Sequence, residues 1–153
     1  MKLKQIKALE WTLQDFLNGR KEFYWVTLTF SWDIEEKDAK AILNRFLTLC
    51  RKWGRSGVWI REYQKSGRIH YHVVSGSPLP VDFWHWGFYF QKKIIKKNLI
   101  DNKNLIEYLK KEVLKNKQVK TQKKFTKRWG VFGGVQRSKV KQIIIEYIPD
   151  KNI

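Results

Sequence analysis

The amino-acid sequence predicts one α+β domain that spans residues 1–153. Apolar residues recur at helical spacing in two segments of the N-terminal third, and shorter runs rich in β-branched and aromatic residues follow, separated by turn residues. A chain of 153 residues can bury a sizeable core without disulfide or metal staples. No internal repeat or low-complexity linker divides the chain, so we expect no second domain.

Two helices are predicted before residue 55. Residues 3–17 carry apolar side chains every three or four positions, and Gly19 supplies a stop. The second helix is predicted to begin at Asp33, which resembles a capping box with Glu36, and to end at Gly54.

Four β-runs are predicted. Residues 23–30 are apolar or aromatic on both parities, as in a central strand covered on both faces. Residues 57–64 and 68–75 are separated by a three-residue loop that ends in glycine, which predicts a hairpin with that glycine in the left-handed region. Residues 88–95 form another strand candidate.

The C-terminal half is less regular. Residues 81–86 predict one short helical turn, and residues 104–115 predict a helix capped by Asn104 with Glu107. Residues 116–128 are almost wholly polar and basic, so we expect a mobile loop there. The segment from Arg128 to Gly134 is interrupted by glycines, and residues 142–148 predict a last strand.

A formal net charge of +18 is the main compositional feature, and it favours a polyanionic partner, nucleic acid before anionic membrane. Residues 92–128 contain 14 Lys/Arg and three acidic residues, a local net charge of +11, so we expect them to form much of the phosphate-facing surface. A solvated lysine face kept for solubility is the alternative. Some of the eight Trp, six Tyr and nine Phe could stack unpaired bases, but most should belong to the core.

The location of the protein and two of its residues follow from simple absences. The sequence has neither the roughly 18 to 20 uninterrupted apolar residues of a membrane span nor a signal peptide. We therefore expect a cytoplasmic protein without membrane association. Cys50, the single cysteine, lies in an apolar helical pattern and His85 lies between two tryptophans, so both are expected to be structural rather than reactive.

Two histidines, His70 and His72, lie in one predicted strand, where alternate residues share a side and sit about 6.6 Å apart. The three-residue loop pairs residue 64 with residue 68, which sets Glu62 across from His70 on the same face. Two imidazoles and a carboxylate leave coordination positions open for a substrate oxygen, and their mixed donors admit Mn²⁺ or Mg²⁺. The alternative is a half-buried strand whose histidines make ordinary hydrogen bonds.

Tyr108 lies at the edge of the apolar face of the helix predicted over residues 104–115, so the core can anchor it while its hydroxyl reaches a cleft. A phenol with an ordinary pKa near 10 is a poor nucleophile at neutral pH. The Lys111 ammonium, one turn further on, would favour the phenolate or hold a scissile phosphate. Amphipathic packing of the tyrosine is the alternative.

Glu62, the triplet at residues 70–72 and the segment at residues 108–111, in this order after the strand at residues 26–30, resemble the three motifs of HUH endonucleases of the rolling-circle replication initiator (Rep) type. The resemblance covers about residues 25–112. It implies a five-stranded antiparallel sheet flanked by helices, with His70, His72 and Glu62 holding Mg²⁺ or Mn²⁺ against the scissile phosphate.

The resemblance also implies the reaction. Tyr108 would attack, leaving a 5′-phosphotyrosine and a free 3′-hydroxyl, and the stored phosphodiester energy would later permit rejoining without ATP. Asn104 and Glu112 occupy the positions four residues either side, so a single-tyrosine enzyme is expected.

The expected partner is single-stranded DNA at an origin, with the need for a stem-loop left open. No GxxxxGK[ST] motif is present, so a host or separate helicase and a polymerase would supply unwinding and synthesis, for a virus, phage or plasmid. The basic side chains expected to contact DNA are Lys65, Arg68, Lys92, Lys93, Lys110, Lys115 and Arg128. A transposase or relaxase of the same fold, an oxygenase iron site and a non-enzymatic nucleic-acid-binding module are the alternatives.

Overall fold

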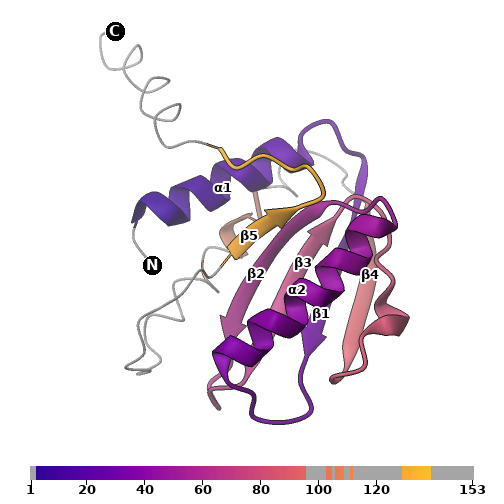
Figure 1. Cartoon of the computed structure of the whole chain (residues 1–153). Helices are drawn as coiled ribbons and strands as arrows, with labels where there is room; N and C mark the ends of the chain where they lie inside the picture. Colours follow the sequence, from indigo (N-terminus) through magenta and orange to yellow (C-terminus); the bar gives the residue numbers. More distant parts are fainter. Residues whose placement is uncertain (1–2, 96–102, 105, 109–110, 112–128, 139–153) are drawn as a thin grey trace, which may run out of the picture.

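The computed structural model describes residues 3–95, 103, 104, 106–108, 111 and 129–138 (Figure 1). Five strands form one sheet in the order β4-β1-β3-β2-β5, and every neighbouring pair is antiparallel. The five-stranded antiparallel α+β architecture is confirmed. The elements in chain order are α1 (Leu3–Leu17), β1 (Glu22–Thr29), α2 (Glu36–Lys52), β2 (Gly57–Tyr63), β3 (Ile69–Ser75), the 3₁₀ turn η1 (Val81–Phe83), β4 (Tyr89–Ile95) and β5 (Trp129–Phe132).

Helix α2 covers one face of the sheet, and Figure 1 shows it lying across the central strands. Its buried residues pack with the residues of β1 and β3 that point to that side, among them Leu28 and Tyr71. Cys50 belongs to this core, and burial raises the pKa of its thiol to about 12. A thiol in this setting is inert at neutral pH, in keeping with the structural role expected for it.

Helix α1 packs on the opposite face, but toward one end. Its apolar side chains share a buried cluster with Phe23, Val58, Ile60 and Val74, which lie on β1, β2 and β3. Further along these strands the same face becomes polar. The residues there, by strand alternation and register, are Thr27, Thr29, Glu62, His70 and His72.

The hairpin between β2 and β3 has the predicted loop. Gly67 has a φ of 87°, and the Gln64 amide donates to the Arg68 carbonyl at 2.8 Å. Glu62 is therefore paired with His70, as the loop length predicts. The register of the candidate site follows from local turn chemistry.

The capping box predicted at Asp33 is wrong. Helix α2 begins at Glu36, and its N-cap residue, Glu35, makes no side-chain capping hydrogen bond. The Glu36 carboxylate is bound elsewhere, because Arg61 Nη1 lies 2.8 Å from Oε1 and the Tyr63 hydroxyl donates to Oε2 at 2.9 Å. Strand contacts on the neighbouring β2 thus outcompete the local cap.

Strand β5 was not predicted, because Gly130 within it reads as a turn. Here the glycine permits close packing: a Cβ at Gly130 would lie 2.5 Å from the Trp59 indole nitrogen. The predicted strand at residues 142–148 and the basic loop at residues 116–128 lie outside the described residues. Of the helix predicted over residues 104–115, the described residues 104, 106–108 and 111 are helical.

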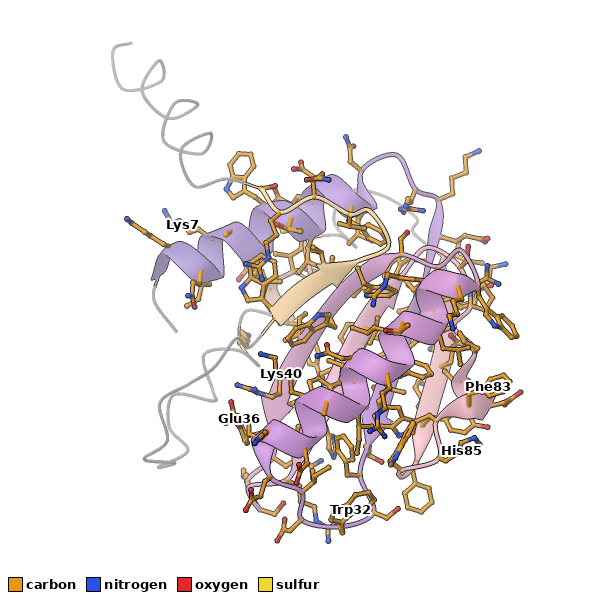
Figure 2. The ribbon with its side chains drawn as sticks, in the orientation of Figure 1. Lys7, Trp32, Glu36, Lys40, Phe83 and His85 are labelled. Carbon is orange, nitrogen blue, oxygen red and sulfur yellow. The ribbon has the colours of Figure 1, made fainter. Side chains whose placement is uncertain are left out.

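His85 follows η1 and is exposed. Its ring lies 6.5 Å from that of Phe83 and 6.2 Å from that of Trp86 (Figure 2). It is remote in function from the two strand histidines, since its ring neighbours are aromatic. Among the described residues, none of the helices has the length and apolar character that crossing a membrane requires.

Candidate metal and nucleophile site

Glu62 and the two strand histidines share one face of the sheet. In the β2–β3 register, Glu62 is paired with His70 and Ile60 with His72, so the three chemically active side chains occupy adjacent rows. Thr27 and Thr29 on β1 are the next residues across in these rows. The face that carries the candidate ligands therefore runs over the three central strands.

The Glu62 carboxylate and the His72 imidazole are in direct contact. Glu62 Oε2 lies 2.5 Å from His72 Nε2, and their side chains are 15% and 8% exposed. On its other side, His72 Nδ1 lies 3.2 Å from Thr27 Oγ1. When Thr27 accepts the Nδ1 proton, Nε2 keeps a lone pair that a cation beside the carboxylate can use.

His70 is set up in the same way. Its Nδ1 lies 3.3 Å from the Gln64 side-chain amide, so Nε2 is the nitrogen turned toward other partners. Burial lowers the pKa of His70, and the nearby charges of His72 and Arg68 lower it further, against an opposing effect of Glu62. The imidazole is thereby kept neutral at pH 7, the form that binds a metal ion.

The donor set fits a divalent cation. Two imidazoles, each with Nδ1 held by a side-chain partner, and one carboxylate provide the nitrogen and oxygen ligands that Mn²⁺ accepts. Within the part of the chain that the structure describes, however, no three His, Cys, Asp or Glu side chains have closed into a group that could hold a metal. Glu62 and His72 are joined, and His70 stands beside them.

Tyr108 is brought to the same neighbourhood by an aromatic residue of β1. The ring centroid of Trp25 lies 5.1 Å from that of His72 and 6.0 Å from that of Tyr108, the latter edge to face. Ile106 is 2% exposed and packs into the α1-side core, whereas Tyr108 is 48% exposed. The short helical segment is thus anchored while its tyrosine remains accessible.

The basic candidates are scattered around this centre. Lys65 and Arg68 are exposed in and beside the hairpin loop, and Lys111 is exposed in the helical segment. Lys92 is exposed opposite Trp25, whereas Lys93 points to the other face and its ammonium lies 3.0 Å from Glu22. The remaining candidates, Lys110, Lys115 and Arg128, lie outside the described residues.

Sequence reasoning missed three contributors: Trp25, Thr27 and Gln64. Gln64 was visible as the residue that closes the hairpin, two positions from Glu62. Trp25 and Thr27 share the parity that faces the histidines, but this becomes visible only once β1 is known to pair with β3. That pairing joins residues more than 40 positions apart and leaves no local signal.

Comparison with known proteins adds one family match. The model of a replication-associated protein family, whose description includes ORF2, matches residues 23–149, which include every candidate ligand and Tyr108. None of the curated proteins matches the chain significantly. Among solved structures, the hypothetical protein ORF119 from Sulfolobus islandicus rod-shaped virus 1 is similar, with 21% identity, a TM-score of 0.49, and coverage of 77% of this chain and 98% of that chain. This likeness is too slight to bear on function.

Proposed function

Because the chain belongs to this replication-associated protein family, we propose that it is a metal-dependent, single-tyrosine endonuclease that nicks and rejoins single-stranded DNA at a replication origin. Tyr108 is the nucleophile in this proposal. Glu62, His70 and His72 would hold Mn²⁺ or Mg²⁺, and Lys111 would assist by its charge.

The contact of one indole with both His72 and Tyr108 carries the proposal. Trp25 joins the ring of a candidate ligand to the ring of the candidate nucleophile, at centroid distances of 5.1 and 6.0 Å. The two candidates are 36 positions apart in sequence and lie on different elements. A purely structural histidine pair would not require an accessible tyrosine beside it.

In the proposed reaction the Tyr108 oxygen attacks the scissile phosphorus. The new bond is tyrosine O–P, the bond to the 3′ oxygen breaks, the phenol proton passes to solvent, and the departing 3′ oxygen takes up a proton. A bound divalent cation would polarise the phosphoryl oxygens. Because the phosphodiester is conserved in the 5′-phosphotyrosine, attack by a 3′-hydroxyl reverses the step and rejoins DNA.

The charge of the chain supports a polyanionic substrate. With a formal net charge of +18, binding to single strands should weaken with salt, with a log-log slope of about −0.7 for each phosphate that is neutralised. In keeping with the family, the protein would act for a virus, phage or plasmid in the cytoplasm of its host. A separate helicase and polymerase would unwind the duplex and extend the 3′-hydroxyl.

The test is trapping of the covalent intermediate. Protein is incubated with Mn²⁺ and labelled single-stranded oligonucleotides that tile the origin region of the replicon, and denaturing electrophoresis then detects a protein–DNA adduct. Wild type should form the adduct and Tyr108→Phe should not. Tyr89→Phe is the matched control, because Tyr89 is similarly exposed but its hydroxyl donates to Asp82. An adduct that persists in Tyr108→Phe, or that never forms, refutes the proposal.

A second candidate is a non-enzymatic module that binds single-stranded nucleic acid. It is favoured by one observation, that no closed three-residue metal group exists among the described residues. Such a module would bind DNA equally well with Mn²⁺ or with EDTA and would give no heat of metal binding in calorimetry. A transposase or relaxase would share the adduct but form it on transposon-end hairpins or a transfer origin.

A further inference from the structure

Two phenylalanines of the β4 segment are unusually exposed. Phe88 is 80% exposed and Phe90 is 54% exposed. Other exposed aromatics have partners: the ring of Phe83 lies 6.0 Å from Trp53, and the Tyr89 hydroxyl donates to Asp82. No ring of the described residues stacks on Phe88 or Phe90. Apolar rings left in water beside a candidate site indicate a surface for binding.

These rings belong to the same face as the candidate site. The β4–β1 register pairs Phe90 with Thr27, and the β1–β3 register pairs Thr27 with His72. Phe90 is thus two strands away from His72 in the same row, a distance of about 10 Å across the sheet. By the same alternation, Lys92 lies on this face, where it pairs with Trp25.

The backbone that carries Phe88 is firmly held. The Thr29 amide and the Thr29 hydroxyl each donate to the Phe88 carbonyl at 2.9 Å, and the Phe88 amide donates to the Thr29 hydroxyl at 2.9 Å. Phe88 therefore presents its ring from an ordered position next to the sheet. An ordered apolar ring loses little conformational entropy when a partner stacks on it.

We propose that Phe88, Phe90 and Lys92 form a platform that binds the unpaired bases and a phosphate of single-stranded DNA beside the scissile phosphodiester. This inference rests on the proposed function and names where the strand lies on the sheet. Unpaired bases offer flat π-faces to both phenyl rings, and the lysine offers a positive charge to the backbone. Duplex DNA keeps its bases stacked inside and cannot use the platform.

A second copy of this chain is a poorer occupant of the same surface. Each copy carries a formal net charge of +18, so two copies repel one another when their basic faces meet. The repulsion is relieved by a polyanion and not by an identical partner. Charge complementarity therefore selects the nucleic acid.

The test measures DNA affinity without chemistry. Fluorescence anisotropy in EDTA compares a labelled single-stranded oligonucleotide with its duplex for wild type, Phe90→Ala, the Phe88→Ala/Phe90→Ala double variant and Phe90→Trp. Loss of stacking should weaken single-strand binding about 5- to 150-fold for each base released. Phe90→Trp should bind as wild type does, and duplex binding should change less than twofold.

Phe83→Ala is the matched control. Phe83 is 46% exposed and contacts Trp53 at the end of α2, on the other side of the sheet. Its removal should leave single-strand affinity unchanged. Unchanged affinity in the double variant overturns the platform, as does loss of self-association in sedimentation without loss of DNA affinity.

The two proposals fail separately. A double variant that binds normally while wild type forms the tyrosine adduct overturns the platform and retains the nuclease. A double variant that loses affinity while no adduct forms in wild type supports the platform, now on a non-enzymatic single-strand-binding protein.

Discussion

The indole of Trp25 lies with its ring centroid 5.1 Å from that of His72 and also contacts Tyr108. A strand residue thereby fixes how far the candidate nucleophile stands from a candidate ligand. Since Trp25 belongs to central strand β1, this spacing is set by one of the best-anchored elements of the sheet.

Replacing Trp25 by alanine should slow adduct formation about 100-fold, because displacement of a reacting group by about 1 Å has effects of that size. Trp25→Phe, which keeps an aromatic ring, should recover most of the rate. Single-turnover kinetics on the origin oligonucleotide measures both. Trp53→Ala removes a comparably exposed tryptophan at the end of α2 and should react at the wild-type rate. Equal rates for Trp25→Ala and wild type would remove Trp25 from the positioning argument.

Glu62→Gln and His72→Ala should abolish stabilisation by Mn²⁺. At a metal concentration 100 times the dissociation constant, binding adds about 2.7 kcal/mol, which corresponds to a rise in Tm of about 5–10 °C for a domain of this size. Thermal unfolding with Mn²⁺ and with EDTA gives the difference directly. His85→Ala should retain the full shift, because His85 lies among aromatic rings at η1. A Mn²⁺ shift that survives in Glu62→Gln and in His72→Ala would place the metal elsewhere.

Gly67→Ala should lower the free energy of unfolding by about 1–2 kcal/mol, since its φ of 87° is strained for a residue with a Cβ while no atom obstructs the methyl group. Because this loop sets the Glu62–His70 register, Mn²⁺ affinity should fall as well. Gly54→Ala, with a φ of 72° and equally open space, should cost similar stability and leave the affinity intact. Urea unfolding and calorimetry separate the two effects. Equal Mn²⁺ affinities in the two variants would show that the loop does not control the site.

The buried thiol of Cys50 predicts a pH dependence of stability. Its folded pKa, about 12, lies above the unfolded value of 9.0, so its contribution is complete below pH 9 and is lost as the pH rises toward 12. Across that window the free energy of unfolding should fall by up to about 1.4 kcal/mol per pH unit more in wild type than in Cys50→Ala. Urea unfolding under reducing conditions at pH 8 to 10.5 provides the comparison. Parallel curves for the two proteins would show that the thiol ionises freely in the fold.

Local sequence patterns were sufficient for the candidate ligands. The three-residue loop sets the hairpin register, and strand alternation then places Glu62 opposite His70 on the face shared with His72. The same type of reasoning failed at Asp33, because tertiary contacts with Arg61 and Tyr63 occupy the Glu36 carboxylate that a capping box would use.

Non-local pairing explains what the sequence did not reveal. The positions of Trp25 and Thr27 beside His72 depend on β1 lying next to β3, and the position of Phe90 depends on β4 lying next to β1. Strand β5 was hidden for a related reason, since a glycine that accommodates a tryptophan from β2 is indistinguishable in sequence from one that forms a turn.

The candidate ligands all lie within the eleven residues from Glu62 to His72, whereas Tyr108 belongs to a separate segment that meets them through one indole. Cation binding and strand cleavage are thus separable traits on this scaffold. A descendant that exchanged the region after β4 would inherit the ion-binding hairpin whole, and could turn from cutting DNA to holding it without rebuilding the sheet.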